Sequence, residues 1–134
     1  MNKITSRHIL VVDDQDNWRE ALTSLLSKEG YMVKTVKCFE DAVHEIEQNN
    51  FDLYVLDVRL VDTDVFNIQG LEILRFIKDR KKDAKVIILT GYPEIIRDKF
   101  LEKYNVEALL LKVPSGSRFN SKEFINQVQN LLHF

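Results

Sequence analysis

Short apolar segments alternate along the chain with longer segments in which apolar residues recur every three or four positions. Five segments are rich in β-branched and aliphatic residues, and each is long enough for one strand and too short for a helix. These segments are Ile9–Val12, Met32–Val36, Leu53–Leu56, Val86–Leu89 and Ala108–Leu111. The third is apolar at every position, which is typical of a strand that helices cover on both faces of a parallel sheet.

The segments between these strands place apolar residues three and four positions apart, which predicts amphipathic helices. In the first, Trp18, Leu22, Leu25 and Leu26 share one helical face, and Gly30 is a suitable stop. Four later segments repeat the spacing through Phe39, Ala42, Val43 and Ile46, through Leu71, Leu74 and Ile77, through Ile96, Phe100 and Tyr104, and through Phe124, Ile125, Val128, Leu131 and Leu132.

Three features mark helix ends. Pro93 suits the first turn of the fourth helix. Asn120 with Glu123 resembles a capping box at the start of the last helix. The charged run Lys78–Asp83 is expected to be a solvated end of the third helix, where its cations suit the helix dipole.

Strands that alternate with helices through short connections predict an α/β domain with a parallel sheet covered on both faces. Right-handed crossovers then favour a doubly wound five-stranded sheet of order 2-1-3-4-5 with five helices, in three layers. At 134 residues, without a linker or an internal repeat, the chain is expected to form a single domain over residues 1–134.

Polar residues follow the predicted strands at their carboxyl ends. The first strand ends in Asp13 and Asp14, the third in Asp57, the fourth in Thr90 and the fifth in Lys112. In a parallel sheet these ends share one edge, and the first and third strands flank the crevice where such sheets bind ligands. We therefore expect three carboxylates, a hydroxyl and an ammonium to converge there. The alternative is that each is an ordinary helix cap or surface charge.

This set of groups suits phosphoryl transfer. Three adjacent carboxylates repel one another unless a cation lies among them, and oxygen ligands with a phosphate nearby suit Mg²⁺. An aspartate such as Asp57 is a known nucleophile for a phosphoryl group. Lys112 and Thr90 are suited to pair with, and donate a hydrogen bond to, the transferred anion.

Composition narrows the classes of function. The chain is 45% hydrophobic and 30% charged, as in ordinary globular proteins. Its net charge of −2 gives no general attraction to nucleic acid or to an anionic membrane, so binding to neither is expected. No apolar run approaches the length of a membrane-spanning helix, and Cys38 is the only cysteine, which excludes an internal disulfide. A cytoplasmic location is expected.

The segments ILVVDDQDNWREALTSLLSKEGYMV, DLYVLDVRL, GLEILRFIK, VIILTGY and LLLK together resemble the response-regulator receiver domain of two-component signalling. The resemblance covers nearly the whole chain and implies a flavodoxin-like fold. It implies that Asp57 accepts a phosphoryl group from a histidine kinase or a phosphotransfer protein. It also implies Mg²⁺ bound by Asp14, Asp57 and the Arg59 main-chain carbonyl, with Asp13 assisting through water. Thr90 and Lys112 would contact the phosphoryl group.

Three positions depart from the family pattern. Gly70 follows Asp57 by 13 positions, about five more than usual, so an insertion lies beside the predicted site. Its acids, Asp62 and Asp64, are expected to be solvated; the alternative is that they adjust the access of the metal or of a partner. Leu109 replaces the usual aromatic residue three positions before the lysine, and Lys112 is followed by Val113 rather than directly by proline. A rebuilt turn and an altered output coupling are expected.

Three functions compete. The first is a phosphorylatable receiver, not a metabolic enzyme, that switches a binding surface for an output partner the sequence does not identify; a second copy of the chain is one candidate. The second is a receiver-like adaptor without useful phosphorylation. The third, a phosphatase of the haloacid dehalogenase type, needs a second aspartate where Arg59 stands. The apolar end of the sequence leans toward a receiver cut from a longer protein. Trp18, a packed helix residue near the acidic pair, is a candidate fluorescent reporter.

Overall fold

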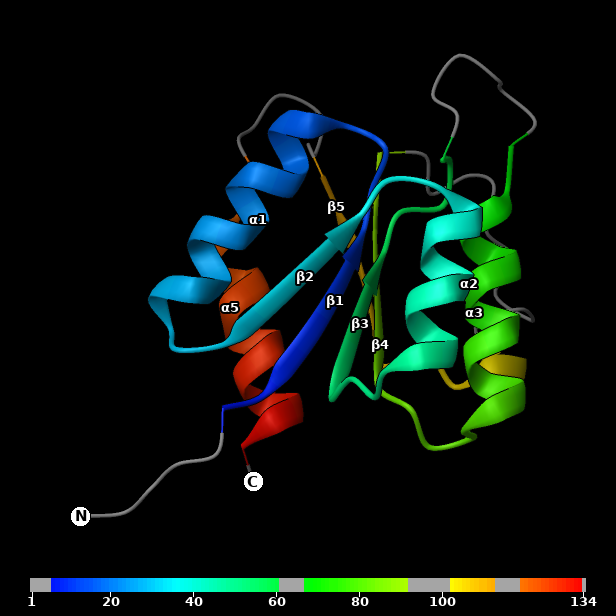
Figure 1. Ribbon diagram of the computed structural model, residues 1–134. Coiled ribbons are helices and arrows are strands. Elements are labelled where there is room, and N and C mark those ends of the chain that lie inside the picture. The colour runs from blue at the N-terminus through cyan, green and yellow to red at the C-terminus, as the bar shows by residue number, and fades with distance from the viewer. Residues whose placement is uncertain (1–5, 61–66, 92–101, 113–118, 134) are drawn as a thin grey trace.

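The computed structural model describes residues 6–60, 67–91, 102–112 and 119–133 (Figure 1). A central sheet is covered by helices α1 and α5 on one face and by α2 and α3 on the other. The five strands are parallel and lie in the order β2-β1-β3-β4-β5. The predicted order and the three layers are confirmed.

The observed strand bounds lie close to the predicted ones. The strands are β1 (His8–Val12), β2 (Met32–Val36), β3 (Leu53–Leu56), β4 (Val86–Thr90) and β5 (Ala108–Leu111). The helices are α1 (Asp16–Lys28), α2 (Phe39–Gln48), α3 (Gln69–Arg80) and α5 (Ser121–Leu132). The predicted fourth helix lies mostly outside the described residues, and its end, residues 102–104, is helical.

Helices on both faces explain why β3 and the Ile9–Val12 part of β1 are apolar at every position. In β1, Ile9 and Val11 pack with the residues of α1 and α5, whereas Leu10 and Val12 pack with those of α2 and α3. Successive side chains of a strand point to opposite faces, so both sets need apolar partners. The continuous apolar runs are therefore the local consequence of a sheet buried on two sides.

Two predicted helix boundaries have the expected backbone or capping geometry. Gly30, just beyond α1, has a φ of +93°, a conformation that glycine adopts without strain. Asn120 precedes α5, and its side-chain oxygen accepts a hydrogen bond from the backbone N–H of Glu123 at 3.0 Å. This contact is one half of the predicted capping box.

The prediction of a solvated end for α3 is wrong at Lys78. This side chain is buried, and its Nζ donates to the carbonyl oxygens of Ala84 at 2.5 Å and Asn105 at 3.0 Å. Glu107 lies 3.5 Å from the same ammonium. Lys78 therefore ties the end of α3 to the turn before β4 and to the turn before β5, and it satisfies carbonyl groups that the helix pattern alone does not reveal.

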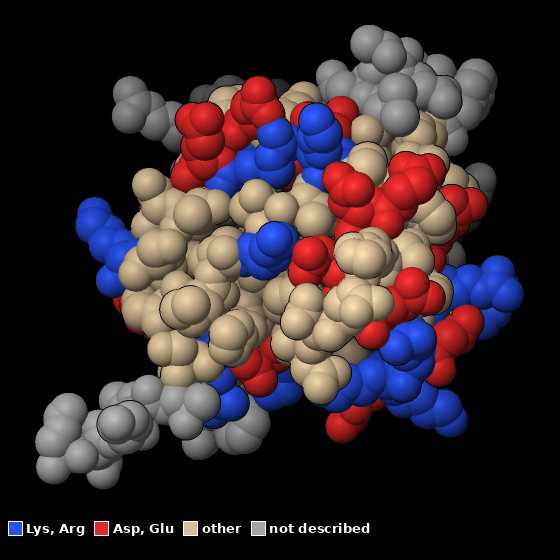
Figure 2. All heavy atoms as spheres, viewed as in Figure 1, with Lys and Arg blue, Asp and Glu red and all other residues tan. Residues whose placement is uncertain are grey.

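The surface does not concentrate one sign of charge on the face that Figure 2 shows, where acidic and basic side chains are interspersed. This mixture agrees with the net charge of −2. Among the described helices, none combines the length and apolar character that crossing a bilayer requires.

Candidate functional site

The sheet register brings the carboxyl ends of β1 and β3 together. Val12 pairs with Leu56, so the next residues, Asp13 and Asp57, emerge side by side from neighbouring strands. The backbone continues the same pattern, because the N–H of Asp57 donates to the carbonyl of Val12 at 2.9 Å. The proximity of the two carboxylates thus follows from strand pairing.

Asp13, Asp14 and Asp57 form one acidic cluster. One carboxylate oxygen from each residue lies within 4.8 Å of the other two, and Asp13 and Asp57 are buried while Asp14 is partly exposed. Like charges this close destabilise one another unless a cation is bound between them. The predicted convergence of the three acids is confirmed.

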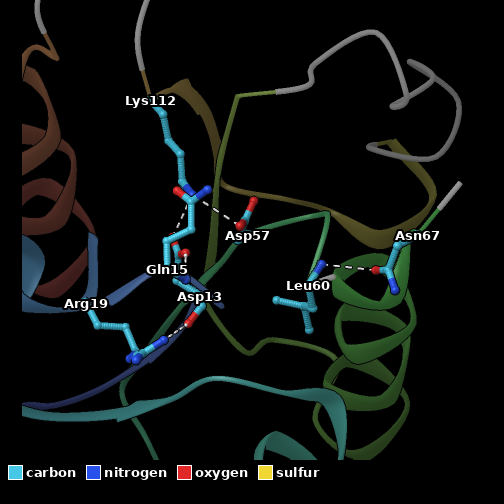
Figure 3. Close-up of polar contacts among 7 residues, drawn as sticks. All are labelled: Asp13, Gln15, Arg19, Asp57, Leu60, Asn67 and Lys112. Atoms are coloured by element: carbon cyan, nitrogen blue, oxygen red, sulfur yellow. Dashed lines mark hydrogen bonds and ion pairs between the residues drawn. The ribbon is translucent and has the colours of Figure 1, made fainter. Parts of the chain in front are cut away.

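Lys112 supplies a positive charge to this cluster from the end of β5. Its buried Nζ lies 2.8 Å from Oδ2 of Asp13 and 3.1 Å from Oδ2 of Asp57 (Figure 3). Both pairs are shielded from water, so their attraction is stronger than that of an exposed ion pair. One ammonium therefore bridges the first and third strands of the sheet.

The charge balance at the cluster shifts two pKa values. Burial raises the pKa of Asp57, the Asp13 carboxylate raises it further, and Lys112 only partly opposes them, so the pKa rises from 3.8 to about 7. Burial alone would lower the pKa of Lys112, but Asp57 and Asp13 outweigh that effect and raise it. The cluster holds more negative charge than one lysine neutralises.

The oxygen of Asp57 that faces away from Lys112 is available to a ligand. Its Oδ1 is buried and has no hydrogen-bond partner among the described residues, although Oδ2 accepts from Lys112. An exposed carboxylate oxygen would bind water, whereas a buried one without a partner carries a desolvation cost. Independently of this oxygen, three carboxylates within 4.8 Å of one another fit a hard divalent cation such as Mg²⁺.

Thr90 lies at the same edge of the sheet. It is fully buried at the last position of β4, and its carbonyl accepts a hydrogen bond from the N–H of Lys112 at 3.0 Å. Arg59 is also buried, two positions beyond Asp57. The structure thus brings Thr90 next to Lys112 as the strand pattern predicts, while the role of the Arg59 carbonyl stays a prediction.

Arg19 and the backbone of Gln15 orient Asp13, which the sequence did not reveal. Oδ1 of Asp13 accepts from the Gln15 N–H at 3.0 Å, and Nη1 of Arg19 donates to the Asp13 carbonyl at 2.8 Å (Figure 3). Arg19 also forms an ion pair with Asp16 on the first turn of α1. These contacts fix the acidic end of β1 against the start of the helix.

Gly70, in the first turn of α3, lies directly against the backbone of Asp57. A Cβ at this position would be 1.8 Å from the Asp57 carbonyl oxygen and 2.7 Å from the Val58 Cα. The Gly70 N–H also donates to the Val58 carbonyl at 2.9 Å. The helix therefore supports the candidate site through a contact that leaves no room for a side chain.

Asn67 ties the two ends of the inserted segment together. Its Oδ1 accepts from the backbone N–H of Leu60 at 3.0 Å and from that of Gln69 at 3.1 Å (Figure 3). The predicted insertion itself, residues 61–66, lies outside the described residues, as do residues 113–118 of the predicted turn after Lys112. An asparagine just before a helix is a sequence signal for such a contact.

We expect Asn67→Ala to lower the free energy of unfolding by about 2 kcal/mol, because it leaves two backbone N–H groups without their acceptor. Urea unfolding followed by circular dichroism measures the change. Asn67→Asp keeps an acceptor oxygen and should retain most of the stability. Equal losses in the two variants would contradict a role for the acceptor.

The comparisons with known proteins agree with this geometry. The sequence profile of the response regulator receiver domain matches residues 9–121. Sensory transduction protein LytT of Bacillus anthracis is 32% identical over 103 residues, which are 75% of this chain and 38% of that protein. The chain thus spans well under half the length of this relative.

Two solved structures share both fold and sequence similarity. Response regulator TrrA of Thermotoga maritima, in complex with Mg²⁺–BeF, is 34% identical, with a TM-score of 0.77 over 94% of this chain and 99% of that one. The same regulator in complex with histidine kinase ThkA gives a TM-score of 0.74 at 34% identity, over 94% of this chain and 98% of that one. By profile, sequence and structure, the chain belongs to the response regulator receiver domain family.

Proposed function

We propose that this receiver domain is switched by phosphorylation of Asp57. Receiver domains are signalling modules rather than enzymes. The observation that carries the assignment is the asymmetry of the Asp57 carboxylate, in which one oxygen pairs with Lys112 and the other is buried without a hydrogen-bond partner among the described residues. An oxygen in this state is suited to form a bond to phosphorus.

The proposed reaction transfers a phosphoryl group from a phosphohistidine to Asp57. Oδ1 of Asp57 attacks phosphorus, a new O–P bond forms, and the N–P bond breaks with its electron pair returning to the imidazole. Lys112 pairs with a phosphoryl oxygen, and Thr90 donates a hydrogen bond to another. Positioning and charge neutralisation supply most of the catalysis in such transfers.

Asp13, Asp14 and Asp57, with the main-chain carbonyl of Arg59, are the proposed ligands of Mg²⁺. When bound, the cation neutralises charge that develops on the transferred group. Two facts support this assignment: the three carboxylates lie within 4.8 Å of one another, and a regulator 34% identical to this chain is known with Mg²⁺–BeF. Asp13 would act through water.

The proposed donor is a histidine kinase or a phosphotransfer protein, which the complex of TrrA with kinase ThkA supports. We infer one receiver domain over residues 1–134, located in the cytoplasm. Phosphorylation would switch a surface around β5 and α5 for an output partner, and a second copy of the chain is a candidate for that partner. Leu109, packed against the core, would transmit the change without an aromatic side chain.

A small phosphodonor such as acetyl phosphate, with Mg²⁺, tests the assignment. We expect one phosphoryl group per chain, detected by intact mass and located at Asp57 by peptide mapping. Asp57→Asn should remove the label, and Asp83→Asn, in an exposed turn, should not. Label that survives Asp57→Asn would contradict the acceptor, and a folded wild-type chain without label would favour the adaptor. Turnover of phosphate esters would favour the phosphatase.

A further inference from the structure

Trp18 lies beside the ammonium of Lys112. Nζ of Lys112 is positioned over the indole ring at 5.1 Å from its centroid, and the same atom lies 2.8 Å from Asp13 and 3.1 Å from Asp57. The ammonium is therefore bounded by two carboxylates and by an aromatic face. Trp18 comes from α1, so a third element joins β1 and β3 in fixing the end of this lysine.

The ring of Trp18 is itself supported by the hydrophobic core. Phe119 packs against it edge to face, with ring centroids 5.0 Å apart and an interplanar angle of 85°. Phe119 in turn contacts Phe124 of α5, with centroids 6.0 Å apart, and Phe124 is fully buried. The indole therefore cannot shift freely, because the partly buried Phe119 and the buried Phe124 lie behind it.

A lysine side chain needs several contacts if its ammonium is to be held at one position in a site. Its ammonium is a compact charge on a flexible four-carbon stem, whereas arginine has a planar, preorganised head group. The two carboxylates attract the ammonium through their charge, from one side of the site. An aromatic face adds a further attraction whose direction is set by the ring, and removal of water from the site strengthens it.

We propose that Trp18 is a positioning residue that holds the Lys112 ammonium toward Asp57, with Phe119 fixing the indole ring. This inference rests on the proposed function of Asp57 and Lys112. The ring touches neither the phosphoryl donor nor the metal ligands in this account, and it acts through the lysine alone. Ordinary packing of an aromatic residue on α1 would predict no dependence on Lys112.

The contact can be tested without phosphorylation. The ring current of an indole shifts protons above its face upfield, so the ε-methylene protons of Lys112 should resonate upfield in a ¹H–¹³C spectrum of the ¹³C-lysine-labelled protein. Lys112→Arg removes the lysine signal and assigns it. Trp18→Leu, which keeps an apolar side chain without a ring, should move the signal to the ordinary lysine position. An ordinary shift in the wild-type protein would overturn the contact.

The consequence for reaction is measured as the rate of phosphoryl uptake from acetyl phosphate with Mg²⁺. Trp18→Leu should slow uptake roughly 5- to 10-fold through displacement of the ammonium, and Trp18→Phe should restore most of the rate. In a Lys112→Ala background, Trp18→Leu should have no further effect. Losses that multiply in the double variant would overturn the proposal, because they would show that Trp18 acts independently of the lysine.

Phe76→Ala is the matched control, since Phe76 of α3 is a half-buried aromatic residue with a cation, Arg80, over its ring at 5.4 Å. Its uptake rate should stay within about twofold of wild type. Circular dichroism confirms folding of each variant. A wild-type protein that shows the upfield lysine signal but takes up no phosphoryl group would refute the proposed function, whereas unchanged uptake in Trp18→Leu would refute only this inference.

Discussion

Gly70→Ala is expected to lower the free energy of unfolding by about 3 kcal/mol or more and to impair Mg²⁺ binding. The new Cβ would lie 1.8 Å from the Asp57 carbonyl oxygen, a distance that no methyl group tolerates. Both sides of the contact are backbone, so no side chain is able to rotate away. Inserting one carbon into a well-packed site typically costs 1–3 kcal/mol, and rigid surroundings place this case at the upper end.

The damage should reach the acidic cluster because the clash falls on Asp57 itself. For α3 to accept the methyl group, its first turn must move away from β3, which breaks the hydrogen bond of 2.9 Å between Gly70 and Val58. The alternative is a displacement of the Asp57 main chain, which carries its carboxylate out of the cluster. Urea unfolding and calorimetric titration with Mg²⁺ measure the two effects.

Gly91→Ala is the matched control for this prediction. Gly91 follows β4, and a Cβ built there meets nothing within 4 Å. Its free energy of unfolding should change by less than about 0.5 kcal/mol. A Gly70→Ala variant as stable as the Gly91→Ala variant would show that α3 adjusts without strain and would contradict the proposed support of Asp57 by the helix.

Asp57→Asn is expected to stabilise the metal-free protein at pH 8. Burial and the neighbouring Asp13 raise the pKa of Asp57 to about 7, so the ionised form is disfavoured in the folded state. Asparagine has nearly the same shape without the charge. Lys112 keeps its second partner, Asp13 at 2.8 Å, so the substitution does not leave a buried ammonium unpaired.

The sign of the pH dependence follows from proton binding. Between about pH 4 and pH 7 the folded state keeps the Asp57 proton that the unfolded state releases, so this group lowers the stability of the wild-type protein as pH rises through that range. Each unit of difference between the folded and unfolded pKa of Asp57 corresponds to about 1.4 kcal/mol, so the destabilisation by this group is at most about 4 kcal/mol. We expect a gain of about 2 kcal/mol for Asp57→Asn at pH 8 and almost none at pH 4.

Urea unfolding in a chelating buffer at several pH values measures this gain. Asp83→Asn, at an exposed position, is the control and should show no comparable trend. Mg²⁺ should stabilise the wild-type protein more than Asp57→Asn, because the cation offsets repulsion that the variant has already lost. If the variant were less stable than wild type at pH 8, the ion pair between Asp57 and Lys112 would outweigh the burial of the Asp57 charge and its repulsion by Asp13, and the prediction would be wrong.

The described residues on either side of the insertion after Asp57 hold the predicted groups in place. Asn67 joins Leu60 to the start of α3 by hydrogen bonds of 3.0 and 3.1 Å, so the residues that flank the insertion are fixed to one another. Gly70 then sets α3 against the strand end. Lengthening a segment whose ends are fixed adds little entropic cost, so an insertion at this point is compatible with an intact acidic cluster.

Much of this molecule was predictable from local pattern. The continuous apolar run of β3 indicated a strand buried on both faces, and the order of strands followed from the alternation with helices. Because parallel strands end at one edge, the convergence of Asp13, Asp57 and Lys112 was also predictable. These features depend on hydrophobic periodicity and chain connectivity, and both can be determined from residues that are close together in the sequence.

Other features depend on contacts between distant segments, and only the tertiary structure decided them. From its position in the helix, Lys78 was predicted to be a surface cation. In the structure its side chain is buried, and its ammonium donates to the carbonyl oxygens of Ala84 and Asn105. The pKa of Asp57 depends on how completely the fold excludes water from one carboxylate. The sequence by itself determined which groups meet at the edge of the sheet. The tertiary structure decided how closely they approach and how far they are buried, because burial and distance depend on packing across the whole fold.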